Sequence, residues 1–207
     1  MNNPDIRPLE ALRLAEDDDE KGKSKGGEAL ESKLLKARTI LVQGPVTDKM
    51  YQNVCARLLY LEHEDPKKEI VVVVNSPGGS ADSGFGIYDM MRFVGCPIQS
   101  ICAGLCASAA VLIFLGADKG RRFVLPHSRF LLHQPSTQSF GQASDMEITA
   151  KEILRTRKRY AEIVSQATGK DADAIQKDSN RDFWLDAQQA LEYKLVDKIV
   201  QRRDEIK

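Results

Sequence analysis

Apolar residues along this chain alternate between two spacings. The continuous β-branched run Glu69–Val74 is typical of a strand buried on both faces of a parallel sheet. Apolar positions at helical spacing predict amphipathic helices over Asp48–Glu62, Ala81–Val94 and Gln142–Thr168. Repeated alternation of strand and helix predicts an α/β domain with right-handed βαβ crossovers.

Shorter elements continue the same alternation. We expect strands over Thr39–Gly44, Ile98–Cys102, Arg122–Leu125, Arg129–Leu132 and Leu195–Val200, and helices from near Ser108, over Asp171–Asp178 and over Asp186–Tyr193. The long helix has apolar positions at Met146, Ile153, Tyr160, Ile163, Val164 and Ala167. Gly169 follows its last residue and predicts a C-cap there.

The first 31 residues lack this patterning. Residues 17–27 are charged, contain glycine and have no large apolar side chain, so they cannot offset the entropy of ordering. We expect a flexible N-terminal segment over residues 1–31, a globular domain over residues 32–201 and a short charged tail over residues 202–207. The first segment is interpreted as a propeptide or an axial segment.

Composition excludes several classes of partner. Lys plus Arg equals Asp plus Glu, 30 against 30, which gives no support for binding nucleic acid or anionic membranes. The longest apolar run, Ala107–Leu115, is too short to span a membrane, and no secretory signal opens the chain. The four cysteines fit neither a zinc site nor a disulfide scaffold. We therefore expect a cytoplasmic protein with no membrane or nucleic-acid partner.

Ser108, His133 and Asp182 are the residue types of a nucleophilic triad. A serine hydroxyl is a poor nucleophile until an imidazole takes its proton and a carboxylate holds that imidazole in the right tautomer. The predicted strand-to-helix position of Ser108 exposes its hydroxyl and brings the positive end of a helix dipole close to it. These residues are the candidate catalytic set.

Several alternatives exist for these roles. A serine among alanines can simply ease helix packing. Asp178 lies four residues before Asp182, a spacing that could put both on one helical face, so it is an alternative orienting carboxylate. Cys106 is an alternative nucleophile. His63 lies between two glutamates like a solvated helix end and His127 has the features of a structural residue, so neither competes well as a general base.

Five stretches, all in the same order, resemble ClpP, the family of Clp protease proteolytic subunits. They are Asn75–Gly79, Ile101–Ala110, Leu125–Pro135, Gly141–Leu154 and Leu185–Ile199. The resemblance runs roughly from Leu34 to Val200 and includes both gaps within the Ser-His-Asp set. It implies the superhelical ββα fold of the ClpP/crotonase type, with a protruding handle helix, for the domain over residues 32–201.

The resemblance also assigns the site. It implies that Ser108 is the nucleophile, that His133 is the base and that Asp182, rather than Asp178, orients the histidine. It implies an oxyanion hole made by the backbone N–H groups of Gly79 and Ala109. The family usually reads Ser-Met-Gly where this chain has Ser108-Ala109-Ala110, a difference that bears on the substrate pocket.

Assembly and partners follow from the same resemblance. It implies two stacked heptameric rings, a tetradecamer of this chain, with Arg181, Gln142 and Glu152 at ring contacts. Substrates would be unfolded polypeptides. The peptidase itself would need no metal or organic cofactor, since ATP is used only by a separate AAA+ unfoldase of the ClpX, ClpA or ClpC type. This chain differs from the family in two features that concern docking of that unfoldase. The family's usual N-terminal pattern is missing, and the strand that often carries docking tyrosines is here Val71–Val74.

These expectations together predict a serine endopeptidase subunit of a self-compartmentalising protease. One alternative is a structural or regulatory subunit without catalysis in a mixed ring, against which the complete Ser-His-Asp set argues. Another is a crotonase-type acyl-CoA enzyme, whose chemistry uses glutamates and no such set.

Overall fold

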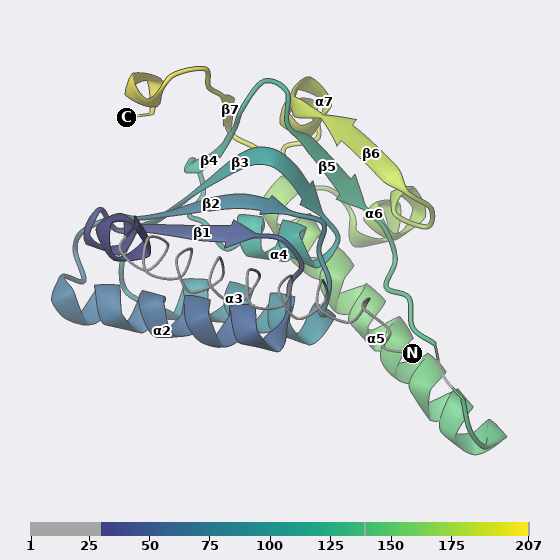
Figure 1. Cartoon of the computed structure of the whole chain (residues 1–207). Helices are drawn as coiled ribbons and strands as arrows, with labels where there is room; N and C mark the ends of the chain where they lie inside the picture. The colour runs from purple at the N-terminus through teal and green to yellow at the C-terminus, as the bar shows by residue number, and fades with distance from the viewer. Residues whose placement is uncertain (1–29, 139, 207) are drawn as a thin grey trace, which may run out of the picture. The chain divides into compact units, whose positions relative to one another are not determined.

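The computed structural model describes residues 30–138 and 140–206, so the predicted segment over residues 1–31 lies almost wholly outside it. A helix over residues 30–36 belongs to a unit that ends at Arg38, and a second unit begins at Thr39. The centre of this second unit is a parallel sheet (Figure 1). Its main strands follow the order β1-β2-β3-β4-β7: β1 (Thr39–Gln43), β2 (Ile70–Ser76), β3 (Ile98–Ala107), β4 (Arg122–Val124) and β7 (Lys198–Ile199).

A bulge in β3 divides this sheet into two parts. Val74 pairs with Cys102 but Ser76 pairs with Cys106, so β3 holds extra residues around Gly104, whose φ is 115°. The Asn75 side chain accepts a hydrogen bond from the N–H of Leu105 (3.0 Å). A Cβ on residue 104 would lie 2.8 Å from the Asn75 Oδ1 atom, which explains the glycine. β-Bulges commonly bend a strand and end its pairing with a neighbour.

Beyond the bulge, β3 changes partner. Its last residues pair in parallel with β5 (Arg129–Leu132), and β5 pairs in antiparallel register with β6 (Phe183–Asp186). The β6 strand was not predicted, and no element was expected between Asp178 and Asp186. Its signal is the short run Phe183-Trp184-Leu185, which has no clear alternation.

Helices cover the sheet on the side of α2 (Asp48–Glu64) and α3 (Ala81–Phe93), as Figure 1 shows. The side chains of Ile70, Val72 and Val74 in β2 are fully buried. Their neighbours Val71 and Val73 are only half-buried. The prediction that this strand is buried on both faces is therefore wrong, because this unit leaves the second face of β2 partly uncovered.

The longest helix, α5 (Ala143–Thr168), extends well beyond the sheet (Figure 1). Its buried residues lie in its last third and include Tyr160 and Val164, whereas Met146, one of the predicted apolar positions, is 47% exposed. Gly169 ends the helix in a left-handed conformation, as predicted, with φ 73°. The remaining helices are α4 (Ala109–Leu115), α6 (Ala172–Asp178), α7 (Ala187–Glu192) and the 3-10 turn η1 (Arg203–Glu205). Within the described ranges, no helix has the length and apolar character needed to cross a membrane.

A buried ion pair joins three of these elements. The Arg122 side chain is 5% exposed and donates through Nη2 to Asp197 Oδ1 (2.9 Å) and through Nε to Oδ2 (3.1 Å). Its Nη1 group donates to the carbonyl oxygen of Ala167 near the end of α5 (3.2 Å). The guanidinium thus ties β4 to α5 and to the segment before β7.

Removing this guanidinium is expected to destabilise the fold strongly. Arg122→Ala leaves the Asp197 carboxylate without its charged partner and is expected to lower the free energy of unfolding by about 3 kcal/mol. Arg92→Ala is the matched control, because Arg92 pairs with Asp118 at the surface, and such pairs contribute less than about 1 kcal/mol. Denaturant unfolding at one protein concentration measures both. Equal midpoints for the two variants would contradict this account.

Candidate active site

Ser108 lies in the turn between β3 and α4, in a backbone conformation that non-glycine residues rarely adopt. Its φ is 55° and its ψ is −125°, a strained geometry of a kind that costs roughly 1–3 kcal/mol. The N–H of Ser108 donates to the carbonyl oxygen of Leu131 in β5 (2.9 Å), and its carbonyl oxygen accepts from Val111 in α4 (3.0 Å). Its hydroxyl does not cap α4. The backbone is therefore fixed while the hydroxyl stays available.

His133 and Asp182 lie next to the last paired residues of β5 and β6. In that antiparallel register Leu131 faces Trp184 and Leu132 faces Phe183, and His133 and Asp182 are the residues immediately beyond this last pair. The N–H of Gln134 then donates to the carbonyl oxygen of Ser179 (2.8 Å), which keeps the two segments adjacent. The unpredicted strand β6 thus brings the late aspartate beside the histidine.

A small cavity brings Ser108 and His133 together. Its volume is about 30 Å³. It is lined by Ala81, Phe85, Ser108, Ala109, Leu112, His133, Pro135, Thr156 and Tyr160. Asp182 is exposed and does not line it. No hydrogen bond within residues 30–138 and 140–206 joins the side chains of Ser108, His133 and Asp182. Catalytic hydrogen bonds often tighten only when substrate binds.

The alternative carboxylate, Asp178, already has a partner. It accepts a hydrogen bond from the Tyr193 hydroxyl (2.8 Å), and burial together with this carboxylate raises the pKa of Tyr193. Helix α6 ends at Asp178, so Asp182 lies beyond it and the two do not share a helical face. That part of the prediction is wrong. The structure thus separates the two aspartates into different surroundings.

The turn after β2 packs directly against Ser108. Gly78 and Gly79 have φ angles of 86° and 148°. A Cβ on residue 78 would lie 2.6 Å from both the Ala107 carbonyl oxygen and Ser108 Cβ. The turn is held by a hydrogen bond from the N–H of Val46 to the carbonyl oxygen of Gly78 (2.8 Å). Only residues without a side chain allow this approach.

Two backbone N–H groups at this contact are free to bind a ligand. Ala109 is the first residue of α4, so its N–H has no acceptor inside the helix. In the part of the chain that the structure describes, no hydrogen bond uses the N–H of Gly79 or of Ala109. Preorganised N–H donors of this kind can stabilise a tetrahedral oxyanion.

The remaining candidates lie in surroundings that do not suit catalysis. Cys106 is fully buried, and burial, with Cys102 nearby, raises the pKa of its thiol well above the usual range. A protonated, inaccessible thiol is a poor nucleophile. His127 is exposed between β4 and β5, and His63 is exposed in the last turn of α2.

The three residues predicted at ring contacts are all exposed in this single chain. Gln142 is the N-cap of α5, Glu152 pairs with Arg155 on the same helix, and Arg181 lies beside Asp182 in the turn before β6. Their role between subunits stays a prediction.

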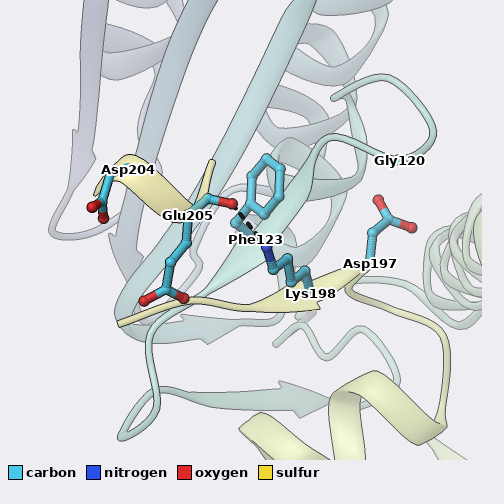
Figure 2. Close-up of a pocket in the computed structure, with 6 residues that line it drawn as sticks. All are labelled: Gly120, Phe123, Asp197, Lys198, Asp204 and Glu205. Atoms are coloured by element: carbon cyan, nitrogen blue, oxygen red, sulfur yellow. Dashed lines mark hydrogen bonds between the residues drawn. The ribbon is translucent and has the colours of Figure 1, made fainter. Parts of the chain in front are cut away.

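A larger cavity, of about 650 Å³, lacks the residues needed for nucleophilic catalysis. It is lined by Gly120, Phe123, Asp197, Lys198, Asp204 and Glu205 (Figure 2). The Lys198 ammonium donates to the backbone oxygen of Glu205 (2.8 Å), and Asp197 is held by Arg122. None of the lining residues is a serine, cysteine or histidine, so this cavity offers no nucleophile with a base.

Comparison with known proteins agrees with this geometry. A family model described as Clp protease matches residues 22–203. The ATP-dependent Clp protease proteolytic subunit of Porphyromonas gingivalis (strain ATCC BAA-308 / W83) is 45% identical over 171 residues, which is 83% of this chain and 77% of that protein. The solved structure of a ClpP1 mutant from Listeria monocytogenes matches with a TM-score of 0.80 at 36% identity, covering 86% of this chain and 99% of that one. The predicted resemblance and fold are confirmed.

A side chain at Gly78 is expected to disturb the position of Ser108. Gly78→Ala and Gly120→Ala form a matched pair, because both glycines have φ near 85° but a Cβ at Gly120 meets nothing within 4 Å. Both variants carry the backbone strain, and Gly78→Ala adds overpacking of roughly 1–3 kcal/mol. We expect Gly78→Ala to give the lower melting temperature and slower labelling of Ser108 by a fluorophosphonate. Equal losses of melting temperature and of labelling rate in the two variants would contradict the close contact between Gly78 and Ser108.

Proposed function

Because this chain belongs to the Clp protease family and is a ClpP-type protease subunit, we propose that it is a catalytic serine endopeptidase acting on unfolded polypeptides. Ser108 is the nucleophile, His133 the general base and Asp182 the orienting carboxylate. The observation that carries the proposal is the cavity shared by Ser108 and His133, with His133 and Asp182 next to the last paired residues of β5 and β6.

The proposed reaction follows from these positions. His133 accepts the Ser108 proton as the serine oxygen attacks the peptide carbonyl carbon, and the N–H groups of Gly79 and Ala109 bind the resulting oxyanion. The protonated histidine then gives its proton to the leaving amine, and an acyl-serine remains. Water, deprotonated by His133, attacks this ester. The histidine then returns that proton to the Ser108 oxygen as the ester bond breaks, which releases the carboxylic acid and restores the free serine. No step requires a metal or organic cofactor.

Asp182 has to contact His133 for this reaction. His133 follows the end of β5 and Asp182 precedes the start of β6, so a small movement of the turn before β6 can bring the carboxylate to the ring. Arg181 lies in that turn and is exposed. We propose that contact between subunits at Arg181 draws Asp182 into place, which would couple assembly to catalysis.

The proposed assembly is two stacked heptameric rings of this chain, with Gln142 and Glu152 of the α5 region at the contacts between rings. The exposed apolar side chains of Met146, Ile148 and Leu154 on α5 support burial of this helix in an assembly. Resemblance to the family supports a cytoplasmic location and delivery of substrate by a AAA+ unfoldase of the ClpX, ClpA or ClpC type, which alone would use ATP. We propose no nucleic-acid or membrane partner.

A second candidate function is a non-catalytic subunit of a mixed ring. The observation that favours it is the exposed Asp182, which makes no hydrogen bond to His133 in the described part of the chain. Fluorophosphonate labelling of the purified chain distinguishes the two: rapid labelling of Ser108 supports catalysis, and none supports the structural role.

The triad assignment predicts non-additive losses. Ser108→Ala is expected to abolish cleavage of small fluorogenic peptides without changing particle size in native mass spectrometry. His133→Ala and Asp182→Ala are expected to lose most activity, and combining either with Ser108→Ala adds nothing, because the three side chains act as one unit. His127→Ala is the control, since that histidine is exposed between β4 and β5. Retained activity in Ser108→Ala would exclude it as the nucleophile.

The coupling through Arg181 predicts linked changes in size and activity. Arg181→Ala is expected to give smaller particles in analytical ultracentrifugation, with low peptidase activity, because the ring contact that positions Asp182 is lost. Arg202→Ala removes an equally exposed cation from the C-terminal segment and is expected to change neither. Intact double rings without activity in Arg181→Ala would separate assembly from catalysis and contradict the coupling.

A further inference from the structure

The cavity that Ser108 and His133 share has room for very few atoms. Its volume of about 30 Å³ is close to the share of one molecule in liquid water, and a methyl group is of similar size. Three helices each contribute two of its lining residues: Ala81 and Phe85 from α3, Ala109 and Leu112 from α4, and Thr156 and Tyr160 from α5. A space of this size distinguishes ligands by their volume.

Helices α3 and α4 are packed too closely for this cavity to widen at little cost. A Cβ on Gly84 of α3 would lie 3.0 Å from both the Cβ and the carbonyl oxygen of Ala109 in α4, so the two helices are in contact there. The Arg159 guanidinium lies over the Phe85 ring, 4.3 Å from its centroid, and covers one face of that ring. Leu112 is only 1% exposed. Walls packed in this way resist the insertion of further methylene groups.

The wall of the cavity suits an alkyl group. The Thr156 hydroxyl donates a hydrogen bond to the carbonyl oxygen of Glu152 (2.9 Å). The Tyr160 hydroxyl oxygen is buried, so it presents almost no surface to this space. In the described part of the chain, no other lining residue apart from Ser108 and His133 has a polar side chain. A polar substrate group would therefore lose its water here without gaining a new partner from the rest of the wall.

The cavity lies where the substrate residue before the scissile bond places its side chain. This step rests on the proposed function, in which the Ser108 oxygen bonds to the scissile carbonyl carbon and the N–H of Ala109 binds the carbonyl oxygen. Both residues line the cavity. The Cα atom of the residue before the bond is attached to that carbonyl carbon and stays there in the acyl-serine, whereas the residue after the bond leaves with the amine.

We infer that this chain prefers alanine before the scissile bond, and that Ala81 and Thr156 are specificity-determining residues that set the size limit. A methyl group fills the cavity, a glycine leaves it empty and a leucine exceeds it. One methylene more or less in an apolar pocket changes kcat/KM by roughly 10- to 200-fold. Ala81 and Thr156 are half-buried, so their side chains can be changed without opening the core.

The first test compares rates on matched substrates. Four fluorogenic peptides differ only in the residue before the cleaved bond, which is glycine, alanine, 2-aminobutyrate (one methylene longer than alanine) or leucine. For the wild-type chain, kcat/KM for the alanine peptide is expected to exceed that for each of the other three by at least about tenfold. Equal values for the four peptides, or fastest cleavage after leucine, would overturn the inference.

A larger side chain at position 81 is expected to close the cavity. Ala81→Val should lower kcat/KM for the alanine peptide at least about tenfold relative to the glycine peptide, because the added methyl groups occupy the space of the substrate methyl. Ala172→Val is the matched control, since Ala172 is also the half-buried first residue of a helix but lies outside the cavity. The control is expected to leave the ratio of the two rates unchanged.

A smaller side chain at position 156 is expected to enlarge the cavity. Thr156→Ala should raise kcat/KM for the 2-aminobutyrate peptide roughly tenfold relative to the alanine peptide. Thr149→Ala is the matched control, because the Thr149 hydroxyl donates to the carbonyl oxygen of Asp145 (2.9 Å) on the same helix, as Thr156 does to that of Glu152, but lies outside the cavity. Unchanged ratios in both Ala81→Val and Thr156→Ala, with melting temperatures equal to those of their controls, would overturn the assignment.

The last test measures binding without chemistry. In the Ser108→Ala background, fluorescence anisotropy gives the affinities of the same four peptides with and without Ala81→Val. Tightest binding of the alanine peptide, lost in Ala81→Val, supports the pocket assignment even if the wild-type chain cleaves nothing, an outcome that would refute only the proposed function. Cleavage without any preference among the four peptides would refute only the specificity assignment. Failure of all four peptides to bind would also overturn it.

Discussion

The change of partner along β3 is the constraint on which the rest of this structure depends. Before the bulge at Gly104 the strand pairs with β4, and after it the strand pairs with β5. The Ser128 hydroxyl, just before β5, donates a hydrogen bond to the Cys102 carbonyl oxygen (3.0 Å) and accepts one from the N–H of Gly104 (2.9 Å). These two bonds fix the point at which β3 leaves β4 and begins to pair with β5. Without this change of partner, β5 would have no parallel neighbour. Ser108 and His133, which follow the ends of β3 and β5, would then not lie close together.

The pairing of strands from distant parts of the chain then places the candidate residues, without direct hydrogen bonds between their side chains. Gly78 approaches from the end of β2, Ser108 from β3, His133 from β5 and Asp182 from β6. Each is held by backbone hydrogen bonds or close packing of its neighbours. The backbone thus fixes the positions of these residues, and the proposed triad would form its hydrogen bonds on substrate binding or assembly, consistent with the exposure of Asp182.

The sequence predicted elements whose periodicity is local and missed features set by distant contacts. The β-branched run of β2 and the glycine cap at Gly169 were readable because each reflects the preferences of a few neighbouring residues. The four-residue strand β6 was missed because its partner β5 lies about fifty residues earlier. Met146 was grouped with the buried positions Tyr160 and Val164 on one apolar face, because helical spacing does not reveal where a helix leaves the body of the domain. Tyr160 was read as one apolar position among several, and its unpaired hydroxyl became visible only with the surrounding helices in place.

The backbone of Ser108 has a consequence for how the chain can change. Its positive φ is a conformation that glycine adopts without strain, so at this position a substitution that relieves strain removes the residue proposed to act in catalysis. A Ser108→Gly chain would keep the turn and relax it, while losing the hydroxyl on which the proposed chemistry depends. Selection for stability alone therefore works against serine here, a local form of the trade-off between stability and activity. The rest of the fold must supply the stability that this one residue gives up.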